Sequence, residues 1–161
     1  MTSQILTTQA STRSLDAWVR LLRGHAATTR SLSAELVAEH GLTINDYEAL
    51  LLLSRAEGNH LKRVELAEGL ILTPSGVTRL LNGLECAGYV DKGSCPTDAR
   101  VHYAVLTEGG ARKLAEASGS HLEAVRALFE ELFDEDELTT LAELLGRLPG
   151  AAGADGAACA A

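Results

Sequence analysis

The sequence has few aromatic residues and no long apolar stretch. Aromatic side chains make up 4% of its 161 residues, whereas hydrophobic residues of all kinds make up 46%. A core of this composition consists mainly of leucine, valine and alanine, which favours packed helices over strands. The longest apolar run, residues 49–53, is far shorter than the roughly 20 residues that cross a membrane. We therefore expect a mainly helical protein without a membrane-spanning segment.

Cysteine is also scarce. The three cysteines, Cys86, Cys95 and Cys159, are odd in number and widely spaced, so they do not suggest a disulfide framework. Residues 1–14 are polar and lack the apolar stretch of a secretory signal, and we expect a cytoplasmic protein. Cys86 is predicted to be buried at a helix end and Cys95 to be exposed in a hairpin. Oxidant sensing would need a reactive thiolate at one of them, and this alternative stays open.

The motifs of common enzymes and metal sites are absent from the sequence. It contains no nucleophile elbow, no phosphate-binding glycine loop and no histidine–carboxylate motif. Its five histidines and three cysteines do not show a ligand spacing such as His-x-x-x-His or Cys-x-x-Cys. We predict that the protein is not an enzyme and that it has no cofactor and no metal site. A metal-sensing regulator remains an alternative.

Negative charge dominates the chain but not its middle. The formal net charge is -8. Between Arg55 and Lys113, eight Lys and Arg residues face seven Asp and Glu residues, so this part carries +1 and the remainder -9. Only the middle of the chain is therefore electrostatically open to the phosphates of a nucleic acid.

The hydrophobic pattern divides the chain into five segments. Apolar positions recur every three or four residues along the first predicted helix, which is typical of one packed helix face. The members of this seam are Leu15, Trp18, Leu22, His25, Thr29, Leu32 and Leu36. The predicted segments are a disordered N-terminus (1–12), a dimerisation helix (13–40), a compact lobe (41–106), two C-terminal dimerisation helices (107–149) and a disordered Ala/Gly tail (150–161).

The lobe is predicted to be a winged helix-turn-helix. A short helix over residues 63–68 is followed by a tight turn and by a second helix that begins at Thr73 and Pro74. Residues 89–90 and 101–105 then indicate two short strands joined by a loop. Four polar residues are placed to cap helices: Thr43, Thr73, Thr107 and Asp134. The predicted fold class is mainly α with a small β-hairpin wing, flanked by long N- and C-terminal dimerisation helices.

This arrangement suits double-stranded DNA. A helix fits the major groove, and its N-terminal residues reach the base edges. In the helix from Pro74, the core leaves free several small polar residues, a glycine that permits close backbone approach, and Arg79, which can pair with guanine. At the wing tip, Asp98 is placed to hold Arg100 for a minor-groove or phosphate contact. The predicted DNA-contacting residues are Thr73, Ser75, Gly76, Thr78, Arg79, Asn82, Asp98 and Arg100.

Five short segments carry a resemblance to a known family. They are residues 66–68 (LAE), 73–80 (TPSGVTRL), 84–90 (LECAGYV), 98–100 (DAR) and 106–110 (LTEGG). On these segments the chain resembles the multiple-antibiotic-resistance regulator (MarR) family. The resemblance implies a homodimer that binds pseudo-palindromic DNA, usually as a repressor. It also implies release of DNA when a phenolic or acidic molecule binds between the dimerisation region and the lobe. The wing departs from the family, because Ala99 stands where many relatives carry a second arginine.

Three residues are candidates for an effector site, and each has a simpler reading. Trp18 and His25 lie seven residues apart on one predicted helix face, and Tyr47 has a hydroxyl that needs a partner if it is buried. All three would equally suit core or dimer packing. A further alternative is a winged helix that binds only another protein, which a gel-shift assay with the protein's own promoter region would separate from a DNA-binding regulator.

Overall fold

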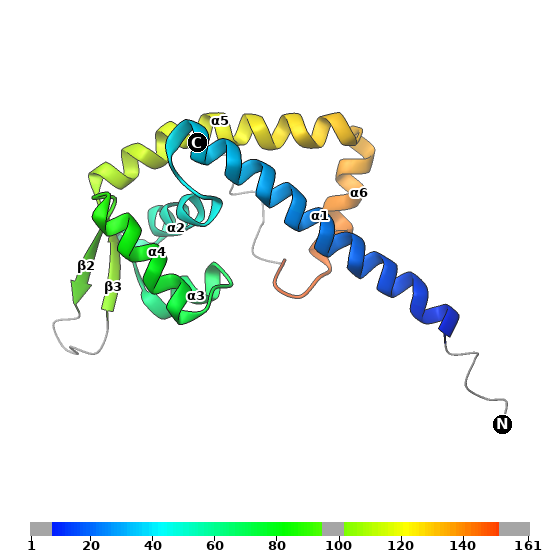
Figure 1. Ribbon diagram of the computed structural model, residues 1–161, viewed down its shortest axis with the longest axis horizontal. Helices are drawn as coiled ribbons and strands as arrows, with labels where there is room; N and C mark the ends of the chain where they lie inside the picture. Colours follow the sequence, from blue (N-terminus) through cyan, green and yellow to red (C-terminus); the bar gives the residue numbers. More distant parts are fainter. Residues whose placement is uncertain (1–7, 95–101, 152–161) are drawn as a thin grey trace, which may run out of the picture.

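A computed structural model, which describes residues 8–94 and 102–151, places a lobe of short elements beside two long helices (Figure 1). The long helices are α1 (Thr8–His40) and α5 (Glu108–Leu132), and α6 (Glu135–Gly146) follows α5. The lobe contains three shorter helices, α2 (Ile44–Arg55), α3 (Arg63–Gly69) and α4 (Pro74–Cys86). The predicted fold class, mainly α with a small β wing, is confirmed.

Helix α1 is longer than the sequence analysis predicted. It begins at Thr8, so the prediction of disorder is wrong for residues 8–12. The sequence has no glycine or proline before Gly24, so no helix-breaking residue separates residues 8–12 from the rest of α1. Leu32 and Leu36, in the last part of α1, are 7% and 2% exposed. Among the described residues, no helix combines the length and the apolar character needed to span a membrane.

The sheet of the lobe has three antiparallel strands in the order β1-β3-β2. The strands are β1 (His60–Lys62), β2 (Val90–Ser94) and β3 (His102–Leu106). Strand β1 was not predicted, because three residues are too few to show an alternating pattern. Strand β2 reaches Ser94, although Gly93 and Ser94 were placed in the loop. Gly93 pairs with Tyr103, and a Cβ at Gly93 would lie 3.0 Å from Cγ2 of Val105, so the glycine permits close packing inside the strand.

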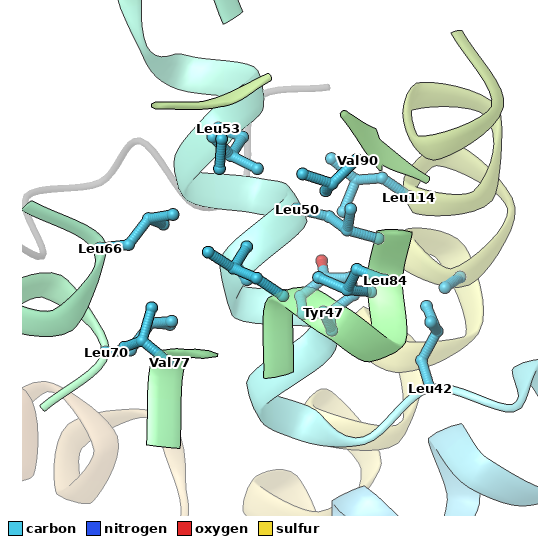
Figure 2. Packing of buried hydrophobic residues seen from close by; sticks show 14 of the residues in the cluster. Leu42, Tyr47, Leu50, Leu53, Leu66, Leu70, Val77, Leu84, Val90 and Leu114 are labelled. Atoms are coloured by element: carbon cyan, nitrogen blue, oxygen red, sulfur yellow. The ribbon is translucent and has the colours of Figure 1, made fainter. Parts of the chain in front are cut away.

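The hydrophobic core of the lobe is centred on α2. Figure 2 shows Leu50 and Leu53 of α2 together with Leu66 of α3 and Val90 of β2. All four side chains are at most 1% exposed, and so is Leu81 of α4. Burying one such side chain stabilises a fold by about 1.5–3 kcal/mol. This core fixes the apolar face of α4 inward and leaves the opposite face of α4 to solvent.

All four predicted helix caps are present. In each one, a side-chain oxygen accepts a hydrogen bond from a backbone N–H in the first turn, at Thr43, Thr73, Thr107 and Asp134. Thr107 does more than cap α5. Its hydroxyl donates to the carbonyl of Gly88 (2.8 Å), and its N–H donates to the carbonyl of Tyr89 (3.1 Å). The start of α5 is therefore attached to the turn between α4 and β2.

Candidate nucleic-acid interface

The N-terminal end of α4 presents a small polar surface. Oγ1 of Thr73 accepts from the N–H of Gly76 (3.2 Å) and lies 3.2 Å from Oγ of Ser75. The hydroxyl of Thr78 donates to the carbonyl of Pro74 (2.9 Å). Thr73, Ser75 and Thr78 are all exposed. Because the hydroxyls of Thr73 and Thr78 already bond within the helix, they present oriented groups to a ligand.

Arg79 and Asn82 extend this exposed face, whereas Gly76 turns partly inward. Arg79 and Asn82 are exposed, and Arg79 forms no ion pair with any residue that the structure describes. Gly76 is half-buried, and a Cβ there would lie 3.2 Å from Oγ1 of Thr73 and 3.6 Å from Cβ of Leu72. Its lack of a side chain thus relieves crowding at the cap.

The stem of the wing is described, but its tip is not. Strands β2 and β3 pair from Val90 with Leu106 to Ser94 with His102. The predicted contact residues Asp98 and Arg100, like Cys95, lie outside the described residues. The structure therefore brings together the six predicted contact residues of the α4 region, and it leaves the two at the wing tip as predictions.

A cluster of ion pairs at the C-terminal end of α4 was not predicted. Glu85, in the last turn of α4, contacts Lys92 of β2 (2.7 Å) and Arg63 of α3 (3.3 Å). These three residues are separated by 22 and 7 positions in the sequence. No local sequence pattern links these residues, and they meet only because the fold brings α3, α4 and β2 together.

The three predicted effector residues lie in different surroundings. Trp18 is 55% exposed on the outer part of α1, and His25 is also exposed. Tyr47 is only 5% exposed, and its hydroxyl lies 3.3 Å from Oγ of Ser118. Its ring centroid is 4.6 Å from that of His121. The structure thus supports the packing interpretation of Tyr47, and it places His25 beside a cleft.

This cleft lies between α1, α2 and the turn before α4. Its volume is about 550 Å³. Its polar lining consists of His25, Thr29, Asn45 and Glu48, and its wall is largely aliphatic, with Ile44, Leu51, Leu52 and the leucine-rich turn. Loss of hydration in the cleft raises the pKa of Glu48, and a protonated His25 opposes this rise. The cleft can therefore hold a small apolar molecule and offer it a carboxyl and an imidazole group.

The rim of the cleft includes an unusual turn residue. Ile71, between α3 and α4, has a φ of 53°, a left-handed conformation that is rare for a β-branched residue. Its side chain is 92% exposed. Thr73, the cap of α4, follows two residues later. Any molecule in the cleft therefore lies next to the turn from which α4 starts.

The structure corrects one prediction about cysteine. Cys86 is exposed rather than buried. It lies about 200° around α4 from the buried Leu84, because successive residues of a helix are rotated by about 100°. Within the described part of the chain, no group of three or more His, Cys, Asp or Glu residues is placed to hold a metal ion.

Comparison with known proteins gives a consistent result. A model of the MarR family matches residues 40–101. The crystal structure of AbsC, a MarR family transcriptional regulator from Streptomyces coelicolor, is 31% identical, and the match covers 83% of this chain and 90% of AbsC with a TM-score of 0.73. Sco3205, from the same organism and solved in complex with DNA, is 25% identical over 80% of each chain, with a TM-score of 0.73. The HTH-type transcriptional repressor YetL of Bacillus subtilis is 30% identical over 69% of this chain and 68% of YetL.

The capped helix α4, its exposed polar face and the adjoining β wing define a winged helix-turn-helix transcriptional regulator that binds DNA. More particularly, the chain belongs to the MarR family.

Proposed function

We propose that this protein is a homodimeric repressor that reads a specific DNA sequence and releases it when a small molecule binds the cleft beside His25. The observation that carries the DNA-reading part is the exposed polar face at the start of α4, with Arg79 unpaired among the described residues. Such a helix end is the part that reaches base edges in the major groove. Repression is inferred from the family and from the name of YetL.

Exposed apolar side chains on α1 and α6 support the dimer. On α1, Leu15, Trp18 and Leu22 are 57%, 55% and 48% exposed. On α6 and just beyond it, Leu144, Leu145 and Leu148 are 50%, 37% and 43% exposed. Apolar surface of this extent on a small protein marks an interface, and a second copy of the chain provides a symmetric partner for both helices.

The substitution Arg79→Ala tests whether Arg79 recognises a specific DNA sequence. If Arg79 pairs with a guanine, its loss should weaken binding to the operator by about 1–3 kcal/mol and relax the preference at one position of each half-site. Binding to scrambled DNA should change much less. The measurement is the affinity of both proteins for an operator duplex and for a scrambled duplex, at several salt concentrations.

Asn82→Ala is the comparison variant, because Asn82 shares the exposed face of α4 but lies one helical turn further from the N-terminus of the helix. We expect it to cost less operator affinity than Arg79→Ala. Equal losses on operator and scrambled DNA for Arg79→Ala would show that Arg79 only contacts phosphate. The sequence would then be read by Ser75, Thr78 or Asn82.

The cleft provides the second test. A phenol can donate its hydroxyl to Glu48, and a carboxylate can pair with protonated His25, so phenol and benzoate separate the two ligand classes. The effective ligand should weaken operator binding by about 5–150-fold, the usual range of coupling between two sites. We expect this coupling to pass through the turn at Ile71, which borders both the cleft and the start of α4.

His25→Ala should reduce the ligand response and leave operator affinity without ligand nearly unchanged. Titration calorimetry and DNA binding in the presence of each ligand measure both quantities. Ser31→Ala, an exposed change on α1 outside the cleft lining, serves as the control and should preserve the response. If His25→Ala instead dissociates the dimer without altering the response, His25 is a packing residue.

A further inference from the structure

Glu85 forms ion pairs with both of its carboxylate oxygens. Oε2 lies 2.7 Å from Nζ of Lys92, and Oε1 accepts a hydrogen bond from Nη2 of Arg63 at 3.3 Å. The side chain of Glu85 is 17% exposed, compared with 97% for Glu108 in the pair with Arg112. Ion pairs that are sheltered from water are screened less by salt than exposed pairs are. Glu85 is therefore placed to influence how the elements that carry its two partners are oriented relative to α4.

The three residues of this cluster come from the DNA-reading helix α4 and from the two elements α3 and β2 that pack against it. Glu85 belongs to the last turn of α4, Arg63 is the first residue of α3, and Lys92 is the middle residue of β2. The chain also turns sharply between α4 and β2, where Gly88 has a φ of 74° and the N–H of Tyr89 donates to the carbonyl of Leu84. One carboxylate thus connects α4 to the helix before it and to the stem of the wing.

Glu85 also limits positive charge in this part of the lobe. With Glu85 ionised, the cluster carries a net charge of +1, and without it Arg63 and Lys92 would leave +2. Additional positive charge strengthens binding to any DNA, because phosphates attract cations regardless of sequence. Loss of the fixed orientation of α4 has the opposite effect, because it weakens binding to the operator. Base-edge contacts require α4 and the wing to dock together.

We propose that Glu85 is a positioning residue for sequence recognition, which holds α4 at a fixed orientation to α3 and to the wing. It acts through Arg63 and Lys92 and not by touching DNA. This inference rests on the proposed sequence-specific DNA binding. It goes beyond that proposal because it assigns a share of the specificity to a residue in the last turn of α4, at the opposite end of the helix from its N-terminal reading surface.

The test compares Glu85→Gln with Glu108→Gln, which removes the same charge from an exposed pair. Affinities are measured for the duplex that the wild-type protein protects in footprinting and for a scrambled duplex. For Glu85→Gln we expect the ratio of operator to scrambled affinity to fall about tenfold, a typical coupling within one salt-bridge network. Affinity for scrambled DNA should stay the same or rise. Glu108→Gln should leave the ratio unchanged.

A purely structural role for Glu85 gives a different result. A folding defect lowers both affinities together and lowers the melting temperature, and this outcome would overturn the proposal. An unchanged ratio for Glu85→Gln would also overturn it. If the wild-type protein itself shows no preference for any duplex, the proposed sequence-specific function fails before Glu85 is tested.

Lys92→Met tests the same proposal from the other side of the ion pair. Lys92 is 62% exposed, so its replacement should be tolerated, and it breaks the shorter ion pair while it leaves the pair with Arg63. We expect Lys92→Met to lower the affinity ratio in the same direction. The double variant should lose no more than Glu85→Gln alone. Additive losses in the double variant would show that Glu85 does not act through Lys92.

Discussion

A chain that ends after Leu132 should fail to dimerise and should not bind DNA. The truncation removes α6 and with it the exposed leucines at positions 144, 145 and 148. It also removes the whole of the apolar hollow that Phe133, Leu141 and Leu144 help to line. Each buried leucine is worth about 1.5–3 kcal/mol, so an interface cannot lose several of them and persist. Without a dimer, only one half-site can be contacted at a time.

Light scattering coupled to size-exclusion chromatography measures the mass, and a gel shift measures DNA binding. A chain that ends at Ala151, and so keeps α6, serves as the control and should remain dimeric. We expect the shorter chain to elute as a monomer or as aggregate. A truncated protein that still forms a dimer and binds the operator would show that α6 is not part of the interface.

Among single substitutions where the lobe contacts α5, Gly110→Ala should lower the free energy of unfolding the most. A Cβ at Gly110 would lie 2.1 Å from the backbone carbonyl oxygen of Tyr89 and 2.8 Å from Cδ1 of Leu106. A backbone carbonyl cannot move aside as a flexible side chain can. Overpacking of this kind costs up to about 3 kcal/mol, and we expect a loss of that size in the free energy of unfolding.

Gly119→Ala is the matched control on the same helix. No atom lies within 4 Å of the Cβ that this change would add. Because alanine favours a helix over glycine by roughly 0.5–1 kcal/mol, the control should stabilise the protein slightly. Urea unfolding followed by circular dichroism measures both variants. Equal stabilities for the two variants would contradict the close packing of α5 against the turn at Tyr89.

The parts of the fold that local chemistry determines could be predicted. Thr73 followed by Pro74 specifies a helix start by capping and by a fixed φ, and α4 begins there. The structure also supports the winged helix-turn-helix and the packing interpretation of Tyr47. Of the residues proposed to contact DNA, those at the start of α4 could be selected from the sequence because the core leaves only one face of that helix exposed.

The parts that depend on distant residues could not be predicted. Strand β1 exists because Lys62 pairs with Tyr103, and the Glu85 cluster exists because three elements converge. Likewise, the cleft beside His25 forms between α1 and the turn at Ile71, two segments that no sequence spacing relates.

Footprinting of the wild-type protein across its own upstream region shows whether it reads a specific DNA sequence. We expect one protected site with two related half-sites, whose centres lie roughly 10 base pairs apart on one face of the duplex. The protection should persist in excess scrambled DNA, and Arg79→Ala should remove it. Uniform protection without a preferred site, or no protection at all, would contradict the proposal that this protein reads a specific DNA sequence.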